Sequence, residues 1–217
     1  MTWVKICGIT SLEDAQAAVA AGADALGFVF YEHSLRKMTP QSAAKIVATL
    51  PSEIEKVGVF VDHSAGQASE IAALVGLTGV QLAQKSIMER QNRLAGWPKI
   101  IVTISSDRLE RGEPAVNEDM RGLADVFLVD SSSAAQPGGT GRTFDWNRAR
   151  PAVQALSAIR PVIVAGGLTP SNVTDAMRLL RPWGVDVASG VEARPGKKDP
   201  DKVRAFVEAV RKADKQQ

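Results

Sequence analysis

Two hydrophobic patterns alternate along this sequence of 217 residues. Short runs rich in β-branched residues are typical of strands, and they alternate with segments whose apolar residues recur at spacings of three and four, which are typical of helices. The run Trp3–Cys7 predicts the first strand, which ends at Gly8. The segment between the N-cap Ser11 and the stop residue Gly22 predicts the first helix, and its apolar positions are Leu12, Ala15, Ala18 and Val19.

This strand–helix unit repeats to the end of the chain. With the first, the predicted strands number eight, the others being Ala25–Phe30, Lys56–Val61, Gly79–Leu82, Lys99–Ile104, Val126–Asp130, Pro161–Ala165 and Val185–Ser189. The further predicted helices are Pro40–Leu50, Ala65–Val75, Ser86–Ala95, Asn117–Leu123, Arg148–Leu156, Pro170–Leu180 and Pro200–Lys212. Three of them begin with a capping residue before a proline, at Thr39-Pro40, Thr169-Pro170 and Asp199-Pro200. The polar segment Ser105–Val116 predicts a long loop.

The alternation predicts an α/β protein with a parallel sheet, and apolar strands such as Val162-Ile163-Val164 predict burial on both faces. A doubly wound sheet usually has five or six strands. Eight consecutive units instead favour a (β/α)8 TIM barrel, which we expect to form a single domain over residues 1–217. In such barrels the active site lies at the carboxyl ends of the strands, so the last residue of each strand becomes a candidate.

The composition excludes several classes of protein. The 26 basic and 24 acidic residues leave a formal charge of +2, and aromatic residues are 5%, which does not favour a nucleic-acid binder. The single cysteine excludes a disulfide framework, and with two histidines it predicts no metal site. No export signal or membrane-length apolar run is present, so we expect a cytoplasmic protein without a membrane partner.

Two strand ends carry candidate catalytic groups. Cys7 ends the first strand just before a predicted helix start, where exposed N–H groups would favour a thiolate, although a lone cysteine is more often a small buried hydrophobe. Asp130 ends the apolar run Val126–Val129, where desolvation can raise the pKa of a carboxyl group enough for a general acid. The alternative is an aspartate that caps the following turn.

Glycine clusters follow the last three predicted strands, within Gly138–Gly141, at Gly166-Gly167 and at Ser189-Gly190. Backbone N–H groups can converge there, and barrels commonly hold a phosphate after strands seven and eight. The clusters therefore predict a phosphorylated small-molecule substrate. The alternative is that these glycines only form tight turns with positive φ.

The spacing of several other polar residues does not decide their roles. Arg36 follows the second strand and could bind a substrate carboxylate, but a solvated basic loop is the default interpretation. The Gln81 amide either reaches the barrel mouth or satisfies a buried polar layer. We assign no chemical role to Asp62, which could cap the third helix, or to Asp186 in mid-strand. The basic residues near the end of the chain predict a solvated helix face: Lys197, Lys198, Lys202, Arg204, Arg211, Lys212 and Lys215.

Several motifs occur in an order that is specific: KICGIT from Lys5, VQL from Val80, GGTG from Gly138, FDW from Phe144, AGGLTP from Ala165 and VDVASGVE from Val185. In this order the sequence resembles the phosphoribosylanthranilate isomerases of tryptophan biosynthesis. The resemblance spans nearly the whole chain.

The resemblance implies an Amadori rearrangement of N-(5-phosphoribosyl)anthranilate to 1-(2-carboxyphenylamino)-1-deoxyribulose 5-phosphate, without cofactor or metal. It implies Asp130 as the general acid and Cys7 as the general base, with Arg36 binding the anthranilate carboxylate. It also implies a phosphate site made by backbone groups around Gly166, Gly167, Ser189 and Gly190, with Gly139 and Gly141 nearby. We count Gln81 among the candidate substrate-binding residues. We expect a monomer or a homodimer.

The sequence departs from the family pattern twice. Ala83-Gln84 replaces the usual His-Gly after VQL, and Leu35 stands where proline commonly precedes the arginine. Two rival functions remain. A histidine-pathway or bifunctional sugar-phosphate isomerase would carry aspartate in place of Cys7 and need a second phosphate site. A barrel that only binds a phosphorylated metabolite would need neither Cys7 nor Asp130.

Overall fold

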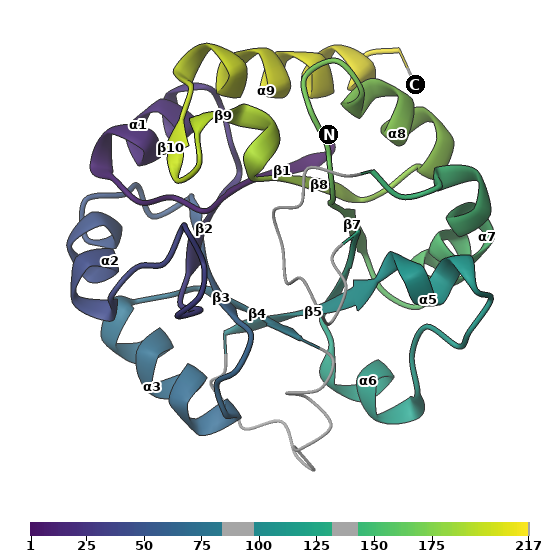
Figure 1. The fold of residues 1–217 in the computed structure, drawn as a ribbon, viewed down its shortest axis with the longest axis horizontal. Helices are drawn as coiled ribbons and strands as arrows, with labels where there is room; N and C mark the ends of the chain where they lie inside the picture. The colour runs from purple at the N-terminus through teal and green to yellow at the C-terminus, as the bar shows by residue number, and fades with distance from the viewer. Residues whose placement is uncertain (84–97, 132–142, 217) are drawn as a thin grey trace.

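The computed structural model describes residues 1–83, 98–131 and 143–216, and these form a closed parallel barrel. Its strands pair in chain order, and β1 pairs with β8 to close the ring (Figure 1). Lys5 of β1 lies opposite Asp186 of β8. The strands are β1 (Trp3–Cys7), β2 (Ala25–Val29), β3 (Glu55–Phe60), β4 (Gly79–Ala83), β5 (Lys99–Ser105), β6 (Val126–Asp130), β7 (Val162–Val164) and β8 (Gly184–Val187). The predicted fold class is confirmed.

Helices surround the barrel and cover its outer face (Figure 1). They are α1 (Leu12–Ala20), α2 (Pro40–Val47), α3 (Ala65–Val75), α5 (Ser106–Glu110), α6 (Glu118–Leu123), α7 (Trp146–Ser157), α8 (Val173–Leu180) and α9 (Pro200–Asp214). The helix predicted at Ser86–Ala95 lies outside the described residues. No described helix has the length and apolar character to cross a membrane.

The two faces of each strand fill two separate cores, because successive side chains of a strand point to opposite sides. Val4 and Ile6 face outward and belong to the large cluster between the strands and the helices. The inward positions form a smaller cluster in the barrel: Trp3, Ala25, Val57, Ile101, Val126, Leu128, Ile163 and Ala165. On the same inward face of β1, Lys5 and then Cys7 follow Trp3 toward the carboxyl end.

The capping predictions hold at two of the three prolines. Thr39 accepts a hydrogen bond from the Ser42 N–H and caps α2, and Asp199 caps α9. The third prediction is wrong, because α8 begins at Val173 rather than at Pro170. The Asn172 side chain instead accepts from the Thr169 N–H at 2.8 Å and donates to the Gly167 carbonyl at 3.0 Å, which braces the turn after β7.

Four further expectations are wrong in detail. The predicted loop after β5 contains the helix α5, and Ser64 rather than Asp62 caps α3. Strand β8 ends at Val187, and Ser189 begins a short 3-10 helix, η1 (Ser189–Val191). The basic segment before α9 is not a helix face, because it forms the hairpin of β9 (Glu192–Arg194) and β10 (Lys197–Lys198).

The last helix covers the seam at which the barrel closes. α9 packs against β1 and its neighbours α1 and α8, and Phe206 on its inner face is fully buried. The two ends of the described chain meet here, because the Thr2 N–H and hydroxyl both donate to the Asp214 carboxylate. The amino-terminal strand is therefore held from outside by the carboxyl-terminal helix.

Replacing Phe206 by alanine removes this buried ring and leaves a cavity beside β1. We expect Phe206→Ala to lower the free energy of unfolding by about 3–5 kcal/mol in urea denaturation, as is typical for a buried phenylalanine. Glu208→Ala, at an exposed position of the same helix, is the control and should change it by less than about 0.5 kcal/mol. Equal effects of the two substitutions would contradict the packing of α9 on the seam.

Candidate active site

The thiol of Cys7 lies at the carboxyl end of β1 against the backbone of β2. Cys7 is 8% exposed and pairs with Gly27 of β2. A Cβ atom at position 27 would lie 2.8 Å from the Cys7 Sγ atom, closer than two such atoms approach. The absence of a side chain at Gly27 therefore leaves room for the sulfur. This role was not predicted from the sequence, because Gly27 lies within an apolar strand.

Burial and nearby charges act on the ionisation of the Cys7 thiol. Helix α1 begins at Leu12 and is capped by Ser11, as the sequence predicts, and the effect of its N–H groups on the thiol stays a prediction. Burial raises the pKa of Cys7 above its ordinary value, and the Asp186 carboxylate adds to this. Three cations, Lys5, Lys198 and Arg36, act in the opposite direction and favour the thiolate.

A buried polar layer lies inside the barrel, below the thiol. Lys5 has no exposed surface, and its Nζ atom lies 2.9 Å from an Asp186 carboxylate oxygen. The same ammonium group donates to Gln81 Oε1 at 2.8 Å, and Gln81 Nε2 donates to the Thr103 hydroxyl at 3.2 Å. Burial alone lowers the pKa of Lys5, but Asp186 and Cys7 raise it above its ordinary value.

Of the two roles that the sequence allowed for Gln81, the structure shows the buried polar layer. Both ends of its amide are engaged by Lys5 and Thr103, and the residue is 7% exposed. Contact of Gln81 with a substrate stays a prediction. Lys5 was overlooked, although a lysine two residues before Cys7 in an otherwise apolar strand is a signal that the sequence carries.

Arg36 is not the solvated loop residue that its spacing suggested. Its side chain is 12% exposed, and its Nε and Nη2 atoms each donate to a different oxygen of Glu192 at 2.8 Å. Hydrogen bonds and attraction from Glu192 raise the pKa of Arg36. Burial opposes ionisation of Glu192, but Arg36 and Lys198 together hold the pKa of this carboxyl below its ordinary value.

Lys198 is likewise buried, at 1% exposure, although the sequence predicted a solvated position. Its Nζ atom lies 3.1 Å from Glu192 Oε1 and donates to the Ala188 carbonyl at 3.0 Å. Burial lowers the pKa of Lys198, whereas Glu192 and Cys7 oppose that change. The β9–β10 hairpin thus carries a carboxylate and an ammonium group to the mouth of the barrel.

Asp130 is the last residue of β6 and is partly buried, in register with Ser105 of β5. In the closed ring β7 and β8 separate β6 from β1, so Asp130 and Cys7 stand at the same end of the barrel on non-adjacent strands. The structure therefore brings both predicted catalytic groups to the end of the barrel where the sequence placed them.

The glycine loops after β7 and β8 approach their neighbours closely. Gly166 and Gly167 have φ values of 84° and 63°, and a Cβ atom at Gly166 would lie 2.4 Å from the Ser131 hydroxyl oxygen. A Cβ atom at Gly190 would lie 1.8 Å from the Leu168 carbonyl oxygen. Within the described part of the chain, the N–H groups of Gly166 and Gly167 have no acceptor. Gly139, Gly141 and Gln84 lie outside the described residues.

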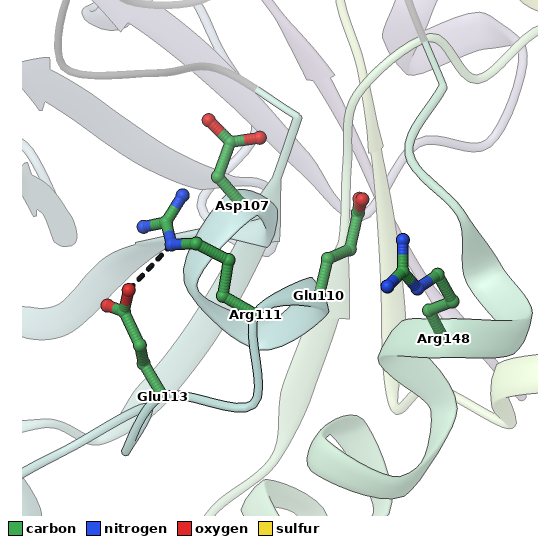
Figure 2. A pocket seen from close by; sticks show the side chains of 5 residues that line it. All are labelled: Asp107, Glu110, Arg111, Glu113 and Arg148. Carbon is green, nitrogen blue, oxygen red and sulfur yellow. Dashed lines mark hydrogen bonds and ion pairs between the residues drawn. The ribbon is translucent and has the colours of Figure 1, made fainter.

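A separate charged hollow of about 550 Å³ lies between α5, the loop after it and α7. Figure 2 shows its lining side chains, with an ion pair between Arg111 and Glu113: they are Asp107, Glu110, Arg111, Glu113 and Arg148. Three acids and two arginines do not suit an anionic ligand, and none of the predicted site residues lines this hollow.

Comparison with known proteins identifies the family. Residues 4–209 match the model of the N-(5'-phosphoribosyl)anthranilate isomerase family. The chain belongs to the phosphoribosylanthranilate isomerase family. A member from Pseudomonas fluorescens is 46% identical over 208 residues, which cover 95% of this chain and 97% of the relative.

Solved structures of phosphoribosylanthranilate isomerases have the same fold. The isomerase from Thermotoga maritima is similar with a TM-score of 0.84 and 38% identity, over 98% of this chain and all of that one. Another is a complex with reduced 1-(o-carboxyphenylamino)-1-deoxyribulose 5-phosphate, with a TM-score of 0.81 and 36% identity over 98% of this chain and 100% of that chain.

The ionisation of Cys7 is directly measurable, because it is the only thiol in the chain. We expect a titration followed by the ultraviolet absorbance of the thiolate to give a midpoint above the usual value of about 8.5. In Lys5→Met the midpoint should rise further, because a cation that stabilises the thiolate is lost.

Two controls accompany this titration. Cys7→Ser gives the background absorbance, and the double variant Lys5→Met, Asp186→Asn avoids an unpaired buried carboxylate. The midpoint of the double variant should also rise, because Lys5 acts on the thiol more strongly than Asp186 does. An unchanged midpoint in both variants would show that Lys5 does not act on Cys7.

Proposed function

We propose that this protein isomerises N-(5-phosphoribosyl)anthranilate to 1-(2-carboxyphenylamino)-1-deoxyribulose 5-phosphate in tryptophan biosynthesis. The observation that carries the proposal is family membership over residues 4–209, with Cys7 and Asp130 at the carboxyl ends of β1 and β6. A general base and a general acid at one barrel mouth are the groups that this rearrangement needs.

In the proposed mechanism, Asp130 donates a proton to the ribose ring oxygen. The bond between C1 and this oxygen breaks, and the nitrogen lone pair forms a Schiff base with C1. The Cys7 thiolate then removes the proton from C2, which is acidic because it is adjacent to an iminium carbon. The resulting enolamine takes up a proton at C1 and loses the proton of its C2 hydroxyl group, which gives the ketone at C2.

The proposed reaction balances within one molecule. C2 is oxidised from alcohol to ketone while C1 is reduced from the aldehyde level, so no external oxidant or reductant is consumed. We therefore propose no cofactor. The protein contributes binding, orientation and two proton transfers. A general acid or base typically raises the reaction rate by a factor of about 10² to 10⁴.

We assign the two charged ends of the substrate to two parts of the mouth. Arg36 would bind the anthranilate carboxylate, because its side chain packs against Gly8, the residue that follows Cys7. The backbone around Gly166, Gly167, Ser189 and Gly190 would hold the phosphate. This is supported by the N–H groups of Gly166 and Gly167, which have no acceptor among the described residues. Gly139, Gly141 and Gln81 complete the proposed binding set. We further propose a cytoplasmic enzyme that is a monomer or a homodimer.

The primary test is turnover of freshly generated phosphoribosylanthranilate. We expect the fluorescence of the anthranilate group to fall faster with the protein present than in a protein-free control. The aminoaldose of histidine biosynthesis, tested in parallel, should react much more slowly because Cys7 stands where its isomerases carry aspartate. Decay at only the spontaneous rate would refute the proposed function.

Replacement of either proton-transfer group should reduce turnover while leaving the fold intact. We expect Cys7→Ser and Asp130→Asn each to lower kcat by about 10² to 10⁴. Asp201→Asn, at an exposed position of α9, is the control and should keep wild-type activity. Near-normal turnover in either active-site variant would remove that residue from the mechanism.

A further inference from the structure

We propose that Glu192 is a positioning residue that fixes one edge of the Arg36 guanidinium group, so that the other edge is presented to a substrate carboxylate. This inference rests on the proposed function and assigns the recognition of the carboxylated aryl group to a pair of residues. Glu192 acts through Arg36 and does not itself touch the substrate.

The hydrogen bonds decide which edge of Arg36 remains available. A guanidinium group offers a side edge formed by Nε and Nη2 and an end edge formed by Nη1 and Nη2. Glu192 occupies the side edge with both of its oxygens, each at 2.8 Å. Within the described residues, Nη1 makes no hydrogen bond. The end edge is therefore left for a second bidentate partner, and a carboxylate matches its geometry.

The rest of the Arg36 side chain is also held in place. A Cβ atom at Gly8 would lie 2.5 Å from Arg36 Cδ, so the arginine stem packs directly on the backbone after β1. The Arg36 N–H donates to the Ser34 hydroxyl at 3.1 Å. The stem, the backbone and one edge of the head group are thus fixed before any substrate arrives.

Glu192 is itself held by the hairpin that carries it. Lys198 Nζ lies 3.1 Å from the Glu192 carboxylate, and Lys202 Nζ donates to the Glu192 carbonyl at 2.9 Å. The Lys198 N–H donates to the buried Asp14 of α1 at 3.1 Å, which ties the hairpin to the barrel wall. A carboxylate anchored in this way can orient an arginine that lies 156 positions away in sequence.

The charges of the cluster favour one further anion. With Lys198 protonated and Cys7 in its thiol form, two cations face one carboxylate, and an additional negative charge would balance the group. Since the side chains are largely buried, this imbalance is screened less than it would be on the surface. The preformed edge also avoids the rotamer entropy that a free arginine would lose on binding. The cluster therefore selects aryl aminosugar phosphates that carry a carboxylate over uncharged analogues.

The test is the substitution Glu192→Gln, which keeps the size of the side chain and removes its charge. We expect KM for phosphoribosylanthranilate to rise by about 10-fold to 100-fold, equivalent to about 1.4–2.8 kcal/mol of binding, while kcat falls much less. Glu208→Gln, exposed on α9, is the matched control and should keep the wild-type KM. Thermal unfolding of each variant monitors the fold separately.

A double-mutant cycle separates positioning from a general structural effect. If Glu192 acts through Arg36, Glu192→Gln should add nothing to the raised KM of Arg36→Ala. An equal rise of KM in both backgrounds, or no rise in either, would refute the inference.

Binding of the reduced product, measured by calorimetry, gives a readout that does not require turnover. We expect its Kd to rise in Glu192→Gln by the same factor as KM. A wild-type protein that is inactive but binds this compound, with weaker binding in Glu192→Gln, would refute the proposed function and support the role of Glu192. Turnover by the wild-type protein together with unchanged binding in Glu192→Gln would support the proposed function and refute the role of Glu192.

Discussion

The ion pair between Lys5 and Asp186 lies in the interior of the barrel, where the two side chains are 0% and 9% exposed and therefore have little or no contact with bulk water. Removing a charge from water costs several kcal/mol unless a partner and further hydrogen bonds replace its hydration. The pair joins β1 to β8 at the seam of the ring, and Gln81 and Thr103 extend the network to β4 and β5. The polar layer therefore links the strands at which the barrel closes to the strands opposite them.

Buried charges at the mouth of the barrel also need partners that replace their hydration. Arg36 and Lys198 are both largely buried, and each relies on the carboxylate of Glu192. Consequently the thiol of Cys7 lies among cations from three separate segments, which offset part of the cost of ionising it in a buried place. The burial of Cys7 disfavours the thiolate and the nearby cations favour it, and these two effects together determine how readily the thiol can serve as a base.

The barrel could be predicted from the sequence because each strand and helix repeats a local pattern of apolar residues. Cys7 and Asp130 could be placed because position along a strand decides which end of a parallel barrel a residue occupies. The partners of Arg36 and the burial of Lys198 could not be predicted, because they depend on a hairpin and a loop that are remote in sequence. The start of α8 was missed because Asn172 uses its side chain to brace the Gly167 turn rather than to cap the helix.

The close fit of the Cys7 sulfur against Gly27 has a consequence for the lifetime of the protein in an oxidising cell. Peroxides attack thiolates, and they do so fastest at exposed cysteines of low pKa. Cys7 has neither property, since it is 8% exposed and its pKa is raised by burial. The chain also holds no second cysteine that could resolve a sulfenic acid as an intramolecular disulfide. We therefore expect Cys7 to be oxidised slowly. This protects the thiol in a chain that has no second cysteine to reverse its oxidation through an intramolecular disulfide.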